Sequence, residues 1–148
     1  MITDEMLFTL SSRLAMLGWL LLAFLPHRGP LLYRSTGLVI PGLLSIAYGA
    51  LMAANFASVE GGGYGSLDQI RALFTVDSVL LAGWIHYLAF DLAIGTWIAK
   101  RSTEIGLSRL IQIPILFMTL MFGPVGFLIF ILTELAMKQL KSSAPRTA

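Results

Sequence analysis

The stretch LAGWIHYLAFDLAIGTWIAK, residues 81–100, decides the fold. It is almost entirely apolar, contains no proline, and ends in Lys100, the kind of side chain that anchors a helix at a membrane surface. A spanning helix needs about 20 mainly apolar residues. The sequence therefore predicts a helix that crosses a lipid bilayer over residues 76–98.

Three further apolar segments have a similar length, and they predict spans over residues 6–25, 37–57 and 110–136. The last of these contains Pro114 and then GPVG at positions 123–126, where proline removes a backbone donor and glycine loosens the helix. The expected fold is an all-α polytopic membrane protein in a single domain, residues 1–148. We expect a four-transmembrane-helix bundle whose last helix is kinked or broken at GPVG, followed by a flexible tail at 138–148.

Composition agrees with a membrane protein. Of the 148 residues, 57% are hydrophobic and 12% charged, against about 45–50% and about 25% in ordinary globular chains. The ten Lys and Arg are spread through loops and ends, so nucleic-acid binding is not indicated. The absence of cysteine excludes disulfides and thiolate chemistry. One histidine inside a span, with scattered carboxylates, does not suggest a metal site.

The loop over residues 58–75 is the longest, with GGGYG at 61–65 and an amphipathic turn, SLDQIRALF, at 66–74. It lacks the GK[ST] of a phosphate-binding loop, so we interpret it as a flexible connection. In the second span Ser45, Gly49 and Ala53 recur every four residues, which predicts close packing of a neighbouring helix.

Asp4 and Glu5 stand where a signal peptide would be basic, so the first span is predicted to be retained. No transit-type segment is seen. Cations concentrate in the connections after the first and third spans, which predicts both termini on the non-cytoplasmic side, although the basic tail disagrees with this orientation. The cations of those connections are Arg28, Arg34, Lys100, Arg101 and Arg109.

Three ionisable residues, Arg13, His86 and Asp91, lie deep within the predicted spans. Each costs about 2.5–3.5 kcal/mol on insertion scales, so each is expected to face a partner, a cavity or water. His86 and Asp91 are separated by about 7.5 Å along the helix and about 140° around it. This spacing excludes a hydrogen-bonded dyad but allows the two side chains to flank one site.

Two interpretations stay open for each of these residues. Asp91 either forms a structural ion pair with Arg13 or takes part in chemistry, and His86 either bonds a backbone group or acts in proton transfer. The predicted catalytic residues are His86 and Asp91. The predicted substrate-binding residues are Arg13, Trp84, Tyr87, Asn55 and Tyr48.

Two segments, LAGWIHYLAFDL at 81–92 and IPILFMTLMFGPVGFL at 113–128, resemble the abscisic-acid-deficient-4-like family of membrane proteins, the relatives of plant neoxanthin synthase. The likeness extends from the turn at Pro26 through the last helix. It implies four membrane helices and, in the plant branch, isomerisation of violaxanthin to neoxanthin by an acid and a base without a redox cofactor. His86 and Asp91 are the positions that match the family's motif.

The sequence is similar to the bacterial branch of this family, and this resemblance implies a location in the bacterial inner membrane. The leading hypothesis is a neoxanthin-synthase-like isomerase that needs no cofactor and acts on a carotenoid or another apolar isoprenoid entering from membrane lipid. One alternative is a non-catalytic carotenoid- or lipid-binding subunit of a membrane assembly. Another is an oligomeric small-molecule transporter with its polar pathway at a subunit interface. A homo-oligomer is left open.

Overall fold

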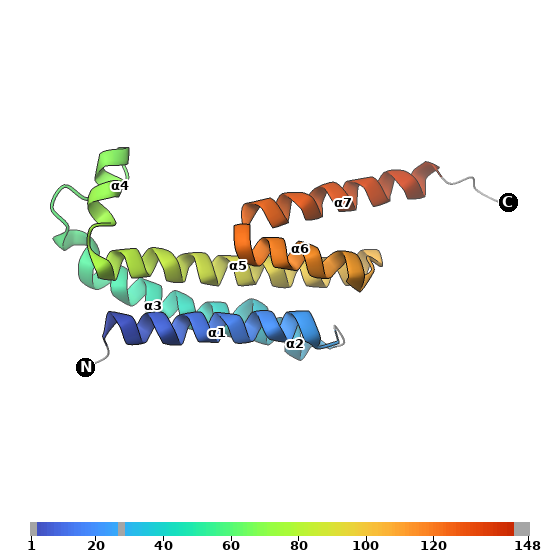
Figure 1. Cartoon of the computed structure of the whole chain (residues 1–148), viewed down its shortest axis with the longest axis horizontal. Coiled ribbons are helices and arrows are strands. Elements are labelled where there is room, and N and C mark those ends of the chain that lie inside the picture. The colour runs from blue at the N-terminus through green and yellow to red at the C-terminus, as the bar shows by residue number, and fades with distance from the viewer. Residues whose placement is uncertain (1–2, 27–28, 144–148) are drawn as a thin grey trace.

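The computed structural model describes residues 3–26 and 29–143, and in these residues the chain is helical with no strands (Figure 1). Three helical stretches are long and apolar enough to cross a membrane. They are α1 (Asp4–Phe24); the run of α2 (Pro30–Arg34), the π-helix η1 (Ser35–Val39), α3 (Ile40–Asn55) and the short η2 (Phe56–Ser58); and α5 (Asp77–Ile105). The other helices are α4 (Leu67–Leu73), α6 (Arg109–Phe122) and α7 (Pro124–Ser143).

Helix α5 forms the centre of the bundle, because it packs against both α1 and α3. Half of its most apolar stretch is buried, against 28% for α1 and 17% for the α2–α3 stretch. Its leucine, isoleucine and alanine side chains make a larger share of the core than those of any other helix, with Ile85 and Leu92 fully enclosed. Gly95 of α5 lies directly against the ring of Trp19, so the two helices approach closely there.

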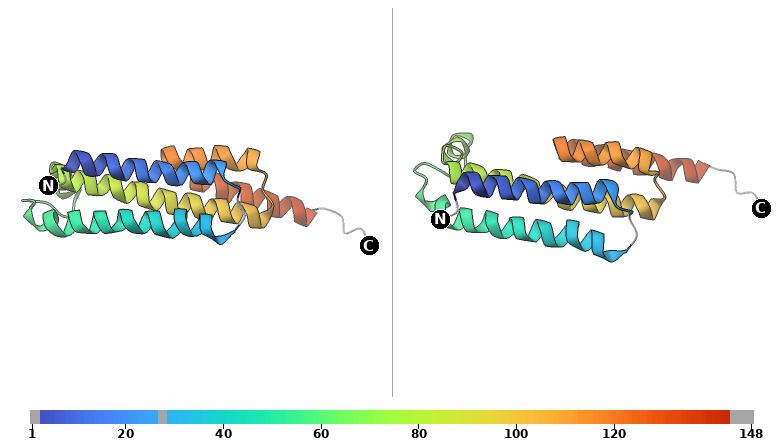
Figure 2. Two further views of the ribbon diagram at one scale, coloured as in Figure 1. Left: turned by 90° about the horizontal axis from the view of Figure 1, so that it is seen from below. Right: turned by 60° about the horizontal axis from the view of Figure 1, so that its bottom comes forward.

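The predicted fourth span is instead a helical hairpin. The break at GPVG is confirmed, but α7 turns back beside α6, and the hairpin lies along the C-terminal half of α5 (Figures 1 and 2). Gly123 makes the turn with φ +31. A Cβ at Gly126 would lie 2.2 Å from the backbone nitrogen of Thr119, so the two helices touch at the apex. At about 1.5 Å per residue, the 14 residues of α6 span about 21 Å, too short for a hydrocarbon core of about 30 Å.

The hairpin bears on the predicted position of the termini. Asp4 and Ser143 lie at opposite ends of the bundle (Figure 1). The placement of both termini on the non-cytoplasmic side stays a prediction. The hairpin also places Lys138 of α7 at the end where the cations of the connections after α1 and α5 lie. Arg34, Lys100, Arg101, Arg109 and Lys138 belong to the end where α5 finishes, which we call the basic end.

Other local predictions have mixed outcomes. The SLDQIRALF turn is confirmed as α4, which begins after Ser66, whose hydroxyl accepts from the Gln69 amide. The Ser45–Gly49–Ala53 stripe lies on the exposed face of α3, so no described helix packs on it, contrary to expectation. Helix α7 extends through Ser143, beyond the predicted end of the last span at residue 136, whereas residues 144–148 of the predicted tail lie outside the described residues.

Candidate functional site

A row of adjoining clefts follows α1 along its contact with α5 and α6. A cleft of about 470 Å³ near the N-terminus adjoins one of about 440 Å³ at Trp84, and the latter adjoins one of about 140 Å³ at Met16, Trp19 and Leu120. From Asp4 to Ala23 the row covers 19 helical steps, or about 28 Å. We call this row the α1 furrow. Its walls include Phe8, Trp19, Trp84, Tyr87, Leu88, Leu116, Phe117 and Met121.

The middle of the α1 furrow is built from aromatic rings whose positions are fixed by contacts. Trp84 donates its indole N–H to the hydroxyl of Ser12 at 3.1 Å. The Trp84 ring lies 5.4 Å from the ring of Tyr87 and 5.9 Å from that of Phe8. Trp84 and Tyr87 were predicted to bind substrate and do line this cleft, whereas Ser12 was missed because the first span offered no motif.

Tyr87 also completes the hydrogen bonding of the hairpin. In a continuous helix the Leu120 carbonyl would accept from the amide four residues later, but that residue is Pro124, which has no N–H. The Tyr87 hydroxyl donates to this carbonyl at 2.8 Å instead. Because an unpaired carbonyl in an apolar setting costs about 1–3 kcal/mol, this bond ties α5 to the end of α6.

Asp91 lies one helical turn after Tyr87, and the two side chains interact. Its carboxylate faces the hairpin apex so closely that a Cβ at Gly123 would lie 2.6 Å from Oδ1. Oδ2 is buried without a hydrogen-bond partner among the described residues. A half-buried carboxyl with one unused oxygen, at the level where a helix is broken, can hold or accept a proton.

His86 lies in a different groove. Its ring stacks on Phe90 at 4.6 Å and lies 5.4 Å from the ring of Tyr48. This groove, of about 350 Å³, is lined by residues of α3, α4 and α5, together with Tyr64, which precedes α4, and Phe74, which follows it. The structure therefore brings predicted residues Tyr48 and His86 together, but it does not place His86 with Asp91.

The two remaining predicted site residues, Arg13 and Asn55, line neither the α1 furrow nor the groove that holds His86. Arg13 lies on the exposed face of α1, and within residues 3–26 and 29–143 no ion pair joins it to Asp91. The structural ion pair, one of the two interpretations left open for Asp91, is therefore not formed: Asp91 faces the hairpin apex and Arg13 is exposed. The side-chain amide of Asn55 donates to the Leu51 carbonyl at 2.8 Å, within its own helix.

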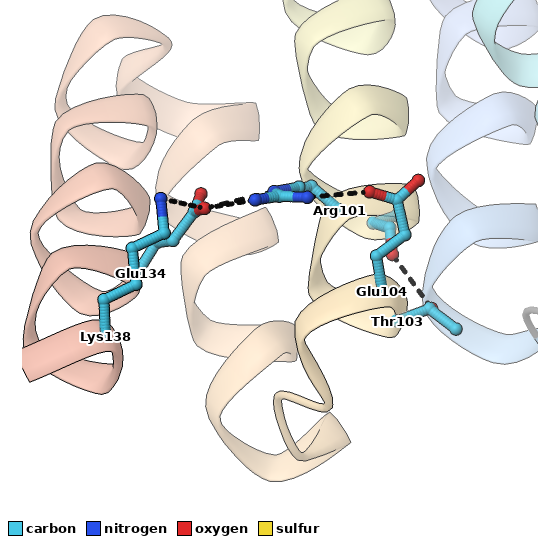
Figure 3. A network of polar contacts seen from close by, with 6 residues as sticks. Arg101, Thr103, Glu104, Glu134 and Lys138 are labelled. Atoms are coloured by element: carbon cyan, nitrogen blue, oxygen red, sulfur yellow. Dashed lines mark hydrogen bonds and ion pairs between the residues drawn. The ribbon is translucent and has the colours of Figure 1, made fainter. Parts of the chain in front are cut away.

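An ion-pair network joins α5 to α7 at the basic end (Figure 3). The Arg101 guanidinium donates to Glu134 at 2.6 Å and to Glu104 at 3.0 Å, and the Lys138 ammonium lies 2.9 Å from Glu134. We call this network the clamp. Glu134 lies in α7, outside the three spans, and its hydrogen bonds from Arg101 and then Lys138 lower the pKa of its carboxyl to about 2. The clamp holds the returning helix of the hairpin against α5.

In the part of the chain that the structure describes, no group of three His, Cys, Asp or Glu side chains is arranged to hold a metal ion. Comparison with known proteins gives one match. The model of a family described as ABA DEFICIENT 4-like matches residues 6–130, which cover the three spans, α6 and the hairpin apex. No curated protein matches the chain. No solved structure matches it either.

Proposed function

Since the chain belongs to the ABA DEFICIENT 4-like family, whose membership indicates a carotenoid-related membrane protein, we propose that it isomerises a carotenoid-type molecule held in the α1 furrow. Asp91 is the proposed catalytic residue: it is not among the residues that line the three clefts, but its side chain interacts with that of Tyr87, which lines the middle one. Tyr87 is proposed to contact the substrate and to position the hairpin apex. The substrate class is a long apolar polyene that carries oxygen on at least one ring.

The observation that carries the proposal is the length of the α1 furrow beside a broken helix. A row of clefts of about 28 Å is close to the thickness of a hydrocarbon core, about 30 Å, so an elongated ligand fits along it. The walls in the middle and toward the basic end are mainly aromatic and aliphatic, and the furrow is open on its side. Such a cleft favours a ligand that enters from lipid.

The isomerisation requires one proton to be donated to the substrate and one proton to be removed from it. In its neutral form the Asp91 carboxyl donates a proton to an epoxide oxygen, and the C–O bond breaks to leave a hydroxyl group. The resulting carboxylate then removes a proton from a neighbouring carbon of the polyene, whose C–H electrons form the new double bond. The molecular formula is unchanged, and Asp91 returns to its starting state.

The test is expression in a carotenoid-producing bacterial host, followed by chromatography and mass spectrometry of the pigments. Wild type is expected to yield a pigment of unchanged mass with altered retention and absorption. Asp91→Asn is expected to abolish it, whereas the matched change Asp68→Asn, on the exposed surface of α4, keeps it. The proposal fails if inserted Asp91→Asn protein gives the wild-type profile.

His86→Gln distinguishes the two grooves. The proposal predicts that this variant keeps the product, because His86 faces the groove of α3 and α4. Loss of product in His86→Gln with retention in Asp91→Asn would instead assign the reaction to that groove. Purified wild-type protein that carries only unchanged pigment would favour a binding subunit rather than an isomerase.

A further inference from the structure

A cleft of about 420 Å³ opens at the basic end, on the side of the bundle formed by α2, η1 and α5. It is separate from the α1 furrow, since the two have no lining residue in common. Arg34 and Lys100 supply its charges. Its walls continue along the helices as Gly37, Leu38, Ala93, Thr96 and Trp97.

The π-helix η1 shapes this cleft. Residues Ser35–Val39 form a wider turn between α2 and α3, and such segments occur often at functional sites. The Thr36 side chain is fully buried and donates to the Leu32 carbonyl at 2.9 Å. Gly37 lies against Thr96, where a Cβ would approach the Thr96 methyl group to 2.9 Å. The wider turn is thus held tightly on α5, next to the two cations.

The two cations differ from their neighbour Arg101. Arg101 forms ion pairs with Glu104 and Glu134, whereas neither Arg34 nor Lys100 has an anionic partner among the residues that the structure describes. Both side chains are exposed. Two unpaired cations at one cleft create a positive potential that attracts an anion.

The walls below these cations are apolar, and one of them is rigid. The Trp97 ring packs against Phe127 and Phe130 of α7 at 5.7 and 5.4 Å. The cleft therefore has a cationic mouth at the end of the bundle and an apolar wall along the spanning helices. A ligand that matches both parts needs an anionic head and a hydrocarbon chain.

We propose that this cleft binds an anionic phospholipid. Its phosphate lies between Arg34 and Lys100, and one acyl chain follows the wall of Leu38, Ala93 and Trp97. Basic pockets between membrane helices bind such headgroups elsewhere, and their lipids concentrate in the cytoplasmic leaflet. The basic end is then the cytoplasmic end, in agreement with the cations gathered there.

The test uses full-length protein in detergent micelles, with phosphatidylglycerol or phosphatidylcholine as the added lipid and native mass spectrometry to count the lipid retained. Each basic side chain near a membrane surface adds about fivefold to anionic-lipid binding, so Arg34→Gln with Lys100→Gln is expected to lower phosphatidylglycerol affinity roughly 25-fold. Phosphatidylcholine binding is expected to change little. The matched control is Arg71→Gln, at the opposite end of the bundle.

A second variant tests the apolar wall. Ala93→Trp fills the cleft without changing its charge and is expected to lower the retention of both lipids. Unchanged phosphatidylglycerol affinity in the double variant, or an equal loss in Arg71→Gln, overturns the proposal. Displacement of the lipid by inorganic phosphate alone would also overturn it, because the site would then recognise phosphate without a chain.

Discussion

Replacing Gly126 by alanine tests whether α6 and α7 touch. In the hairpin the new Cβ would lie 2.2 Å from the backbone nitrogen of Thr119 and 2.3 Å from its hydroxyl oxygen. The contact with a backbone atom allows no relief by rotation of a side chain. The two helices must therefore separate at the apex, next to Asp91.

The sign of the effect distinguishes the hairpin from a continuous fourth helix. Overpacking costs about 1–3 kcal/mol, and a contact with backbone belongs at the upper end, so we expect a loss of about 3 kcal/mol of unfolding free energy. In a continuous helix, residues 119 and 126 would be about 10 Å apart along the axis. Alanine would then stabilise the helix by up to about 1 kcal/mol relative to glycine.

The assay is reversible unfolding in detergent, followed by circular dichroism. Gly49→Ala is the matched control, because Gly49 lies within α3 and a Cβ there would meet nothing within 4 Å. It is expected to be neutral or stabilising by up to about 1 kcal/mol. Equal stability of Gly126→Ala and wild type would refute the contact at the apex.

Further predictions concern the bonds that hold the hairpin. Tyr87→Phe leaves the Leu120 carbonyl unpaired and is expected to lower the unfolding free energy by about 1–3 kcal/mol, measured in the same assay; no change would contradict the bond. Glu134→Gln removes the charge at the centre of the clamp and is expected to speed hydrogen exchange in α7 at neutral pH. Since the folded-state pKa of Glu134 is lowered to about 2, its contribution to stability is full above the ordinary glutamate pKa of about 4.3 and is lost as pH falls toward the folded value. Wild-type α7 should therefore stay protected through mildly acidic pH, and loosening near neutral pH would count against the clamp.

Sequence reasoning located the spans because length and hydropathy are properties of single segments. Residues 6–25 and 76–98 were predicted where α1 and α5 lie, and the break at GPVG follows from proline and glycine chemistry. The reversal of direction was missed. It depends on φ at Gly123 and on the contact between Gly126 and Thr119, which are tertiary features, whereas the mainly apolar stretch 110–136 also fits one bent span.

The candidate site was predicted in part for the same reason. Asp91 was identified by its position in the middle of a predicted span, and Trp84 and Tyr87 by their aromatic side chains, since both properties follow from the sequence of one helix. The residues that these side chains contact could not be predicted, because they depend on which helix faces pack together. The pair of Asp91 with Arg13 was therefore left open as one interpretation and is not formed, although the missing N–H of Pro124 could have indicated an unpaired carbonyl at Leu120.

The most direct test of the re-entrant hairpin is the side from which single cysteines react with a membrane-impermeant thiol reagent, in a chain that has no cysteine of its own. Suitable positions are Glu60 in the loop before α4, Ser108 between α5 and α6, and Ser143 at the end of α7. The hairpin predicts that Ser108→Cys and Ser143→Cys react from one side of the membrane and Glu60→Cys from the other. Reaction of Ser143→Cys from the same side as Glu60→Cys would show a fourth span and contradict the hairpin.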